Sequence, residues 1–360
     1  MKDNTQALLS PEECKQQFID LSGVEFEPDI AANLWPMVLK HKWLLSEKLY
    51  RDVGLRTACI DFLDNMEHAP DEEEAHKRRS ILNEMGAQTM SREMWDTISD
   101  SQPPKQLVQR KIILPLIEAG LSQKHGVVPP KTILFFGPPG TGKTHFAKAI
   151  AGALSWKYIE IVPSMLMVDG VEKIGANLRE LMEKGRDLDE VVLFIDEFEE
   201  IAGSRDVGDR IDKSITNEFL KQISLLKNQK NKILLVCATN YIRQLDAAML
   251  RPGRFDCIIP VGGLDKEGRT TILEYYLAKL NTGDVNVEQI VELTSGFTPA
   301  DIQYLFQQAA HFAFEQELAS KKDYLVTAET FVHILPKVPP SLSDEVIDEF
   351  KKDSVSFSRV

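Results

Sequence analysis

The sequence feature that most constrains this chain is the string Gly-Pro-Pro-Gly-Thr-Gly-Lys-Thr at residues 137–144. An apolar run at residues 132–136 precedes the string, and a helix-like stretch at residues 145–150 follows it. A strand that ends in a tight turn and continues into a helix directs backbone N–H groups and the positive end of the helix towards a phosphate. This context predicts a nucleoside triphosphate site on an α/β sheet, rather than a surface turn rich in glycine and proline.

Individual positions in the string have separate expected tasks. Gly140 and Gly142 lack the Cβ that would keep the backbone away from the phosphates. Lys143 is expected to reach the β- and γ-phosphates, and the Thr144 hydroxyl is expected to bind Mg²⁺. The residues expected to contact the nucleotide are Gly137, Pro138, Pro139, Gly140, Thr141, Gly142, Lys143, Thr144 and His145.

A second motif is the apolar run at residues 191–195, which ends in the paired acids Asp196 and Glu197. Ligands of open α/β sheets bind at the carboxyl ends of the strands. Neighbouring strand residues point in opposite directions, so we expect Asp196 to bind the Mg²⁺ hydration shell and Glu197 to orient and activate the attacking water. The alternative is a polar strand end before an acidic helix start at residues 199–200; the preceding phosphate loop favours the first interpretation.

Two further motifs follow in the chain. Residues 233–239 form a strand-like run that ends at Asn240, whose side chain is suited to hydrogen-bond a γ-phosphate or the attacking water. Arg251 and Arg254 flank a Pro-Gly turn, which predicts an exposed corner. Planar guanidinium groups there suit bidentate contact with a neighbour's γ-phosphate, as arginine fingers supplied in trans. A surface turn with solvated arginines is the alternative.

Composition limits the class of protein. The 360 residues carry a formal net charge of −13, which disfavours non-specific attraction to nucleic acid but is compatible with a local basic patch. The four cysteines form no zinc pattern and fit reduced thiols in a cytosolic compartment: Cys14, Cys59, Cys237 and Cys257. The chain has no apolar signal core and no run of about 18 apolar residues, so we expect a cytoplasmic protein without a membrane span.

The predicted domains are a helical N-terminal module and linker (1–104), a large α/β domain (105–262), a small helical lid (263–341) and a C-terminal tail (342–360). Helical spacing of apolar residues from 35 to 66, with a break at Gly54, supports the first module, and Pro103-Pro104 sets its boundary. Fully apolar runs suit parallel strands that are covered by helices on both faces. The large domain is predicted to contain strands at 132–136, 158–162, 191–195 and 233–238, and helices at 177–184 and 213–226.

In this order, the four motifs make residues 105–345 resemble the AAA branch of the AAA+ ATPases. The resemblance implies a RecA-like αβα nucleotide-binding domain with a parallel sheet and a small helical lid. It also implies ATP and Mg²⁺ as cofactors and a ring oligomer, a hexamer in the ATP state. The implied family roles are Walker A for Lys143 and Thr144, Walker B for Asp196 and Glu197, sensor 1 for Asn240, and fingers for Arg251 and Arg254.

Other segments refine this resemblance. Residues 296–301 look like the family's lid motif, which packs near the adenine and ribose and carries no sensor arginine in this branch. Pro299 replaces the more usual glycine there, which should change the start of the helix rather than abolish binding. Residues 217–222 and 340–345 look most like the katanin- and spastin-like group.

Two departures from the family pattern bear on function. Members that thread protein usually place an aromatic–apolar pair near what is here residues 169–172, but residues 165–189 contain no Phe, Tyr or Trp. Residues 165–168 are apolar and adaptable enough to contact a substrate, or they belong to the strand–helix core. Leu225 and Leu226 replace an Asp-Gly pair that the family often uses for signalling between subunits. Hydrolysis is therefore better supported than threading.

The sequence thus predicts an ATPase that remodels a protein or protein complex, with two alternatives. One is an ATP-controlled assembly switch or scaffold without threading. The other is a nucleic-acid-linked AAA+ loader, which the acidic charge and the absent lid arginine disfavour. The expected partners are further copies of the chain and an unidentified protein substrate or adaptor.

The resemblance implies that the N-terminal module carries the site for that adaptor or substrate. It contains Trp35, Trp43 and Trp95, and aromatic residues are enriched at interface hot spots. The alternative is a helical pair that is held by tryptophan core packing and by an i,i+4 pair between Glu47 and Arg51.

Overall fold

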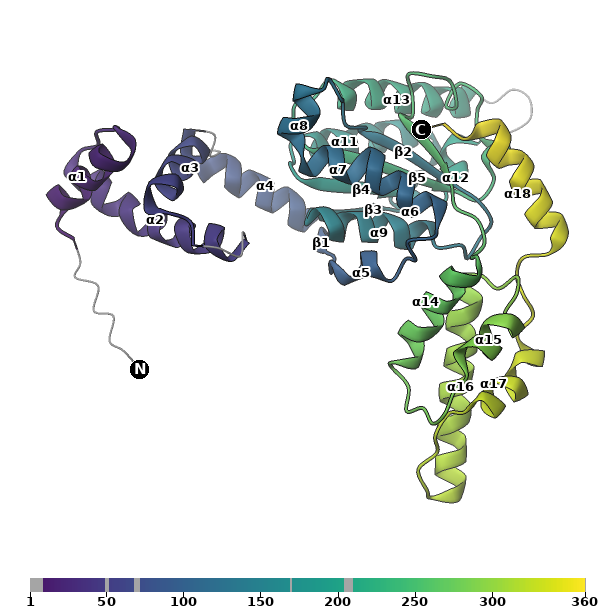
Figure 1. Ribbon diagram of the computed structural model, residues 1–360. Helices are drawn as coiled ribbons and strands as arrows, with labels where there is room; N and C mark the ends of the chain where they lie inside the picture. Colours follow the sequence, from purple (N-terminus) through teal and green to yellow (C-terminus); the bar gives the residue numbers. More distant parts are fainter. Residues whose placement is uncertain (1–8, 49–51, 68–71, 169, 204–209, 360) are drawn as a thin grey trace. The chain divides into compact units, whose positions relative to one another are not determined.

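The computed structural model describes residues 9–48, 52–67, 72–168, 170–203 and 210–359 (Figure 1). The chain divides into two compact units, Met1–Lys77 and Arg78–Val360. Helix α4, Glu72–Glu84, contains the point of division. Within the described ranges, no helix combines the length and hydropathy that a membrane crossing requires.

In the described part of the first unit, the start of α4 follows the helices α1 (Pro11–Ser22), α2 (Pro28–Lys48) and α3 (Leu55–Glu67). Ser10 and Glu13 form a capping box at the start of α1, and Gly23 ends the helix in the left-handed conformation at φ 79°. Phe18 and Trp35 meet edge to face, with ring centroids 5.5 Å apart, at the centre of the bundle. The predicted helical N-terminal region is confirmed.

The tryptophans of the sequence prediction have different environments. Trp35 is buried, Trp43 is 62 % exposed, and Trp95 belongs to the second unit, where it packs against the large-domain core. Core packing therefore accounts for Trp35 and Trp95 but not for Trp43. The predicted pair of Glu47 with Arg51 lies outside the described residues.

The second unit contains a six-stranded sheet in the order β1-β3-β4-β5-β2-β6. Five strands run parallel, and β1 pairs antiparallel with β3 at one edge. The predicted α/β class is confirmed, with β1 and β6 as strands that the sequence prediction did not include. The strands are β1 (Gln88–Thr89), β2 (Thr132–Phe136), β3 (Lys157–Ile161), β4 (Val191–Ile195), β5 (Ile233–Thr239) and β6 (Cys257–Pro260).

Helices cover both faces of this sheet (Figure 1). Strand residues alternate between two cores: Leu134 and Phe136 lie in one, and Ile133 and Phe135 lie in the other. The Leu134 face carries α10 (Pro163–Leu166), α11 (Ile174–Arg186), α12 (Glu199–Ala202) and α13 (Arg210–Lys227). The other face carries α5 (Glu93–Asp96), α6 (Pro103–Val108), a π-helix (Gln109–Ile113), α7 (Leu114–Ile117) and α9 (Lys143–Leu154). Helix α8 (Ala119–Lys124) follows α7, and 3₁₀ turns occupy Val171–Lys173 and Ile242–Gln244.

A second, helical core forms the lid domain, around Leu273, Phe306 and Phe331. Its helices are α14 (Lys266–Leu277), α15 (Val287–Leu293), α16 (Pro299–Ser320) and α17 (Ala328–Ile334), followed by a 3₁₀ turn at Leu335–Lys337. Thr298 caps α16 in a capping box with Asp301, and Pro299 is the first residue of the helix. Pro299 therefore occupies the first helical position, where its missing N–H removes no hydrogen bond of the helix.

The predicted boundary at residue 104 differs from the structure, because the second unit already begins at Arg78. Ile81 packs in the large-domain core, and β1 adds to the edge of the sheet. At the other end of the chain, the predicted tail contains a helix, α18 (Asp344–Phe357), with Phe350 and Phe357 packed against the same core. Residues 78–104 and 344–359 therefore belong structurally to the nucleotide domain.

Candidate nucleotide-binding site

A cavity of about 520 Å³ opens at the carboxyl ends of β2, β4 and β5. Its lining comes from the phosphate loop and start of α9, the residues that follow β4, β5 and β6, the segment that follows α5, and the lid. This is where parallel α/β sheets bind ligands. Most of the predicted loop residues line it, namely Pro139, Gly140, Thr141, Gly142, Lys143, Thr144 and His145. Gly137 and Pro138 do not line this cavity and lie behind it.

Two glycines of the loop have backbone positions that exclude other residues. Gly137 has φ 151°, and a Cβ there would lie 2.1 Å from the carbonyl oxygen of Val261. Gly140 has φ 76°, and a Cβ there would lie 3.1 Å from Thr298 Oγ1 in the lid. The amide of Ala300 donates to the Gly140 carbonyl at 3.4 Å, so the lid directly contacts the loop.

Lys143 begins α9 and is only 6 % exposed. Its Nζ donates to the carbonyl oxygens of Gly137 and Pro138 at 2.8 and 2.9 Å. Burial lowers the pKa of Lys143 to about 8, although the negative charges of Asp196 and Glu199 oppose this shift. The ammonium group is therefore held over the loop, in a site where its charge is poorly solvated.

The two predicted metal-binding residues lie in direct contact. Thr144 Oγ1, in the first turn of α9, donates at 2.7 Å to Oδ2 of Asp196, the residue after β4. A hydroxyl and a carboxylate are the oxygen ligands that Mg²⁺ takes in nucleotide sites. The donor set therefore fits Mg²⁺ together with a triphosphate held by the loop.

Glu197 has a different environment from Asp196, and its predicted task of activating water stays a prediction. Its backbone has φ 48°, an uncommon value for a residue other than glycine, and its side chain is exposed and lines the cavity. The charge of Glu200, then burial, then the charge of Asp196 raise the pKa of the Glu197 carboxyl. The two adjacent acids therefore have separate environments, one bonded to Thr144 and the other free to meet solvent.

Asn240 lines the cavity beside these acids. Its backbone N–H donates to Glu199 Oε1 at 3.2 Å, which connects the end of β5 to the start of α12. Within the described ranges, Glu199 Oε2 is the one buried side-chain oxygen that has no hydrogen-bond partner. The sequence predicts Glu199 only as part of an acidic helix start. Its contact with the backbone of Asn240 is not indicated by any local pattern.

His145 faces the segment after α5 rather than solvent. Its Nε2 lies 2.7 Å from Thr97 Oγ1, and Thr97 in turn donates to the Met94 carbonyl. Burial is the main cause that lowers the pKa of His145, so its imidazole is neutral near pH 7. Its predicted contact with nucleotide stays a prediction, and the structure adds a contact that fixes the ring.

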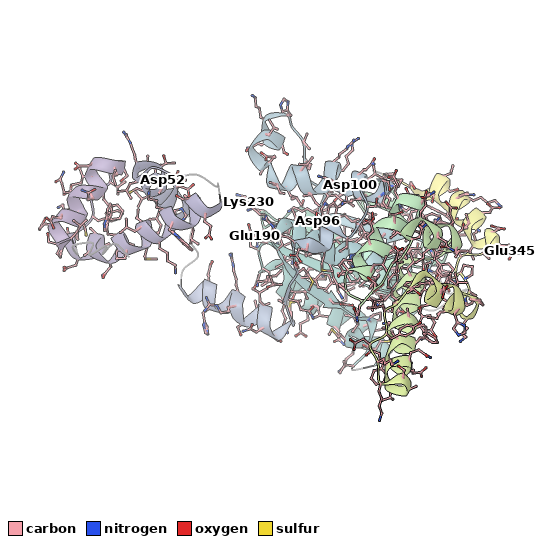
Figure 2. All side chains as sticks on the ribbon, turned by 60° about the horizontal axis from the view of Figure 1, so that its bottom comes forward. Asp52, Asp96, Asp100, Glu190, Lys230 and Glu345 are labelled. Carbon is pink, nitrogen blue, oxygen red and sulfur yellow. The ribbon has the colours of Figure 1, made fainter. Side chains whose placement is uncertain are left out.

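Sequence reasoning missed the wall of the cavity formed by residues 97–102. Gln102 Nε2 donates to Asp265 Oδ1 at 2.8 Å, which ties this segment to the start of the lid. Lys105 is 4 % exposed and pairs at 2.8 Å with Asp100, one of the residues labelled in Figure 2. The segment lies far from the phosphate loop in sequence, so no local pattern indicates its place.

The lid wall was also missed. Tyr275 and Tyr276 line the cavity, and Lys279 Nζ lies 3.8 Å from the centre of the Tyr275 ring. Their positions on α14 follow from the packing of the lid, which periodicity alone does not give. Both rings are suited to contact a flat aromatic base.

Arg251 and Arg254 do not line the cavity. They lie on the turn between β5 and β6, where Arg251 is exposed and Arg254 is partly exposed. The structure therefore brings the phosphate loop, the paired acids and Asn240 together, and leaves the two arginines elsewhere on the same subunit.

The apolar stretch considered for substrate contact divides between core and surface. Leu166 is fully buried and Met167 packs against the core, whereas Met165 and Val168 are 49 % and 78 % exposed. Residue 169 lies outside the described ranges. The core interpretation therefore holds for Leu166 and Met167, and substrate contact by Met165 and Val168 stays a prediction.

Comparisons with known proteins agree with this geometry. Residues 133–262 match the family described as ATPase family associated with various cellular activities (AAA), and residues 284–325 match the AAA+ lid domain. The chain is 35 % identical over 257 residues to the Cell division cycle protein 48 homolog of Archaeoglobus fulgidus, covering 68 % of this chain and 35 % of that protein. It is 37 % identical over 227 residues to a proteasome-activating nucleotidase of Saccharolobus islandicus, covering 61 % and 58 %.

A solved structure extends the comparison to the fold. The crystal structure of the FIGL-1 AAA domain superposes with a TM-score of 0.67 at 25 % identity, covering 78 % of this chain and 96 % of that one. The phosphate loop and the paired acids thus lie in the part that matches the AAA family, and the lid helices α15 and α16 lie in the part that matches the AAA+ lid domain. The chain is a member of the AAA+ family of ATPases. It spans about a third of the length of the Cell division cycle protein 48 homolog and 58 % of the nucleotidase.

Proposed function

We propose that the chain hydrolyses ATP with Mg²⁺ at the interfaces of a ring and uses this reaction to remodel a protein or protein complex. The observation that carries the proposal is the 2.7 Å contact of Thr144 with Asp196 beside the buried Lys143, with Glu197 separate and exposed. This is the division of labour that phosphoryl transfer to water requires.

Each residue of the site has a task in this reaction. MgATP supplies the scissile phosphate and the metal charge that offsets the charge developing on it. Lys143 contributes a further positive charge, and Asp196 and Thr144 hold the metal. Glu197 accepts a hydrogen bond from the attacking water, and the pKa of its carboxyl is raised in the single subunit, first by the charge of Glu200. Asn240 contributes a side-chain amide for the γ-phosphate or the water.

The arginines favour a site that is shared between copies. Arg251 and Arg254 are absent from the lining of their own subunit's cavity, so they are available to a neighbour. An arginine finger stabilises charge in the transition state, and one supplied in trans makes turnover depend on assembly. The proposed assembly is a ring, a hexamer in the ATP state.

The proposed substrate is a protein rather than a nucleic acid. The relatives include a proteasome-activating nucleotidase, and the net charge of −13 opposes attraction to phosphate backbones. The three-helix unit of residues 11–67 is the proposed place for a partner or adaptor, and its Trp43 is 62 % exposed.

A second candidate is an assembly switch that uses ATP without threading a substrate. Leu226 is fully buried and Leu225 is 39 % exposed, so neither supplies a polar group for signalling between subunits. Among residues 164–168, Met165 and Val168 are the exposed apolar side chains that could contact a substrate. A switch predicts that Val168→Ala is tolerated, whereas a threading machine predicts that it abolishes stimulation by substrate.

The experiment that tests the shared site is ATP hydrolysis against protein concentration for wild type, Glu197→Gln and Arg254→Ala, with mass photometry on the same samples. We expect cooperative turnover and ATP-dependent rings in wild type and little turnover in either variant. A mixture of the two variants should regain activity, because one supplies the finger and the other the carboxylate. Monomeric turnover that is insensitive to Arg254→Ala would refute the ring.

A further inference from the structure

Helix α18 packs directly against the base of the phosphate loop. The Phe350 ring lies 6.1 Å from that of Phe136, the last residue of β2. A Cβ on Gly262 would lie 2.4 Å from Phe350, and one on Gly137 would lie 3.1 Å from it. The middle of the helix is thus fitted to the backbone that leads into the nucleotide site.

The residues beyond the C-terminal end of α18 hold the turn that carries Arg251 and Arg254. Arg359 Nη1 donates to the Leu250 carbonyl at 2.9 Å, and Nη2 donates to the Phe255 carbonyl at 2.7 Å. These carbonyls flank residues 251–254 on both sides. The backbone of Arg359 also exchanges two hydrogen bonds with Ile258 of β6, at 2.6 and 3.0 Å. One guanidinium fork therefore closes the base of the turn.

Residues beside Phe350 on α18 pair with the turn that follows Asn240. Arg243 contacts Glu349 at 3.0 Å and Asp353 at 2.7 Å. Arg243 is half exposed, and such ion pairs contribute little to stability. The core contacts of Phe350 and Phe357 and the Arg359 fork are therefore the main attachments of the segment.

We propose that Arg359 is a positioning residue for ATP hydrolysis, which sets the turn of residues 250–255 so that Arg251 and Arg254 reach the neighbouring subunit. This inference rests on the shared site proposed above. Arg359 contacts the turn that carries the two arginines and does not line the cavity of its own subunit, so its effect is directional. It supports turnover in the neighbour's site and not in its own.

The geometry requires arginine in particular. The two donors of a guanidinium are separated and fixed in one plane, so they reach two carbonyls at once, whereas a lysine ammonium has no such fork. The turn also has attachments that do not involve Arg359. Lys227 Nζ donates to the Gly253 carbonyl at 3.2 Å and pairs with Asp256 at 2.6 Å. Loss of the fork should therefore loosen the turn without unfolding the domain.

Steady-state kinetics separate positioning from a general loss of structure. We expect Arg359→Ala to lower kcat roughly tenfold and to change the KM for ATP less than about twofold, because Arg359 does not line the cavity. Arg359→Lys should recover only part of kcat. The control is Lys352→Ala, an exposed position on the same helix. A rise in KM with kcat unchanged would overturn the inference.

Mixing experiments test the direction of the effect. In a ring that mixes Arg359→Ala with Glu197→Gln, a Glu197→Gln subunit has an intact turn at residues 250–255 (the finger turn). It supplies this turn to a neighbouring Arg359→Ala subunit, whose own nucleotide site is intact. We expect this mixture to regain turnover, while a mixture of Arg359→Ala with Arg254→Ala stays slow. Equal results from both mixtures would overturn the inference.

The reference mixture of Arg254→Ala with Glu197→Gln distinguishes the two proposals. If that reference regains activity but the Arg359→Ala mixture does not, only the role of Arg359 fails. If the reference regains none, the shared site fails and the inference with it. Hydrogen exchange gives a readout without turnover: amides 250–255 should exchange faster in Arg359→Ala, and in Arg359→Lys if the alanine variant does not fold. Unchanged exchange in a folded variant would also refute the inference.

Discussion

The affinity of the site for MgATP should fall steeply above pH 8, because Lys143 must be protonated to bind a triphosphate. Its pKa is about 8 in this structure, so about 90 % of the protein carries the ammonium at pH 7, about 50 % at pH 8 and about 10 % at pH 9. The phosphates of ATP are already ionised over this range. The apparent Kd should therefore rise about tenfold between pH 7 and pH 9, which equals about 1.4 kcal/mol.

Stability should change in the opposite direction. The folded-state pKa of Lys143 lies below its value of 10.5 in the unfolded chain, so between pH 8 and 10.5 the unfolded chain binds more protons. The contribution of Lys143 to the free energy of unfolding therefore increases as pH rises through this window, while nucleotide affinity decreases. An exposed lysine at this position would show neither effect below about pH 10.

Calorimetric titration with MgATP in two buffers of different ionisation enthalpy measures both the affinity and the proton uptake. We expect an uptake of about half a proton per site at pH 8 and about 0.9 at pH 9. Lys143→Met should bind weakly and without pH dependence. Glu199→Gln should shift the midpoint to lower pH, because the Glu199 charge raises the pKa of Lys143. A Kd that is constant from pH 7 to pH 9, with no proton uptake, would refute this reasoning.

Three other changes test single contacts. Glu197→Gln should raise the thermal midpoint of the nucleotide-free protein at pH 7, because the charge of Glu200 and then burial raise the pKa of Glu197 and disfavour its ionised form in the folded state. The gain should vanish below about pH 4.5, where Glu197 is neutral in the folded and the unfolded chain. Gly137→Ala should destabilise the protein by at least about 2 kcal/mol in chemical denaturation, since its Cβ would lie 2.1 Å from a carbonyl oxygen. Gly120→Ala, with open space, should not. Thr144→Val should raise the Mg²⁺ concentration for half-maximal turnover roughly tenfold, and Thr144→Ser should restore the wild-type value. An unchanged Mg²⁺ requirement in Thr144→Val would show that the hydroxyl does not bind the metal.

The centre of the site could be predicted from sequence because a single rule brings its parts together. Residues 137–144, the pair at 196–197 and Asn240 each follow a strand, and the carboxyl ends of parallel strands meet at one edge of a sheet. No long-range contact has to be known to apply this rule. The fold class followed from the same alternation of apolar runs with helical patterns.

The walls of the site depend on contacts that local patterns do not encode. Thr97 meets His145 across 48 positions of sequence, and Gln102 meets Asp265 across 163. Pro103-Pro104 was interpreted as a boundary, but it begins α6 inside the second unit. Proline is favoured in the first turn of a helix as well as in linkers, so composition alone does not distinguish the two.

The charges of the site support a shared interface on electrostatic grounds. Glu197 is exposed, its pKa is raised first by Glu200, and it faces no cation within the lining of its own cavity other than the buried Lys143 and the neutral His145. A guanidinium from a neighbouring subunit would lower the pKa of Glu197 and offset this repulsion. Assembly would then change the basicity of Glu197 and would also complete the site. The turn of residues 250–255, which Arg359 holds, would therefore control both the charge and the geometry of hydrolysis.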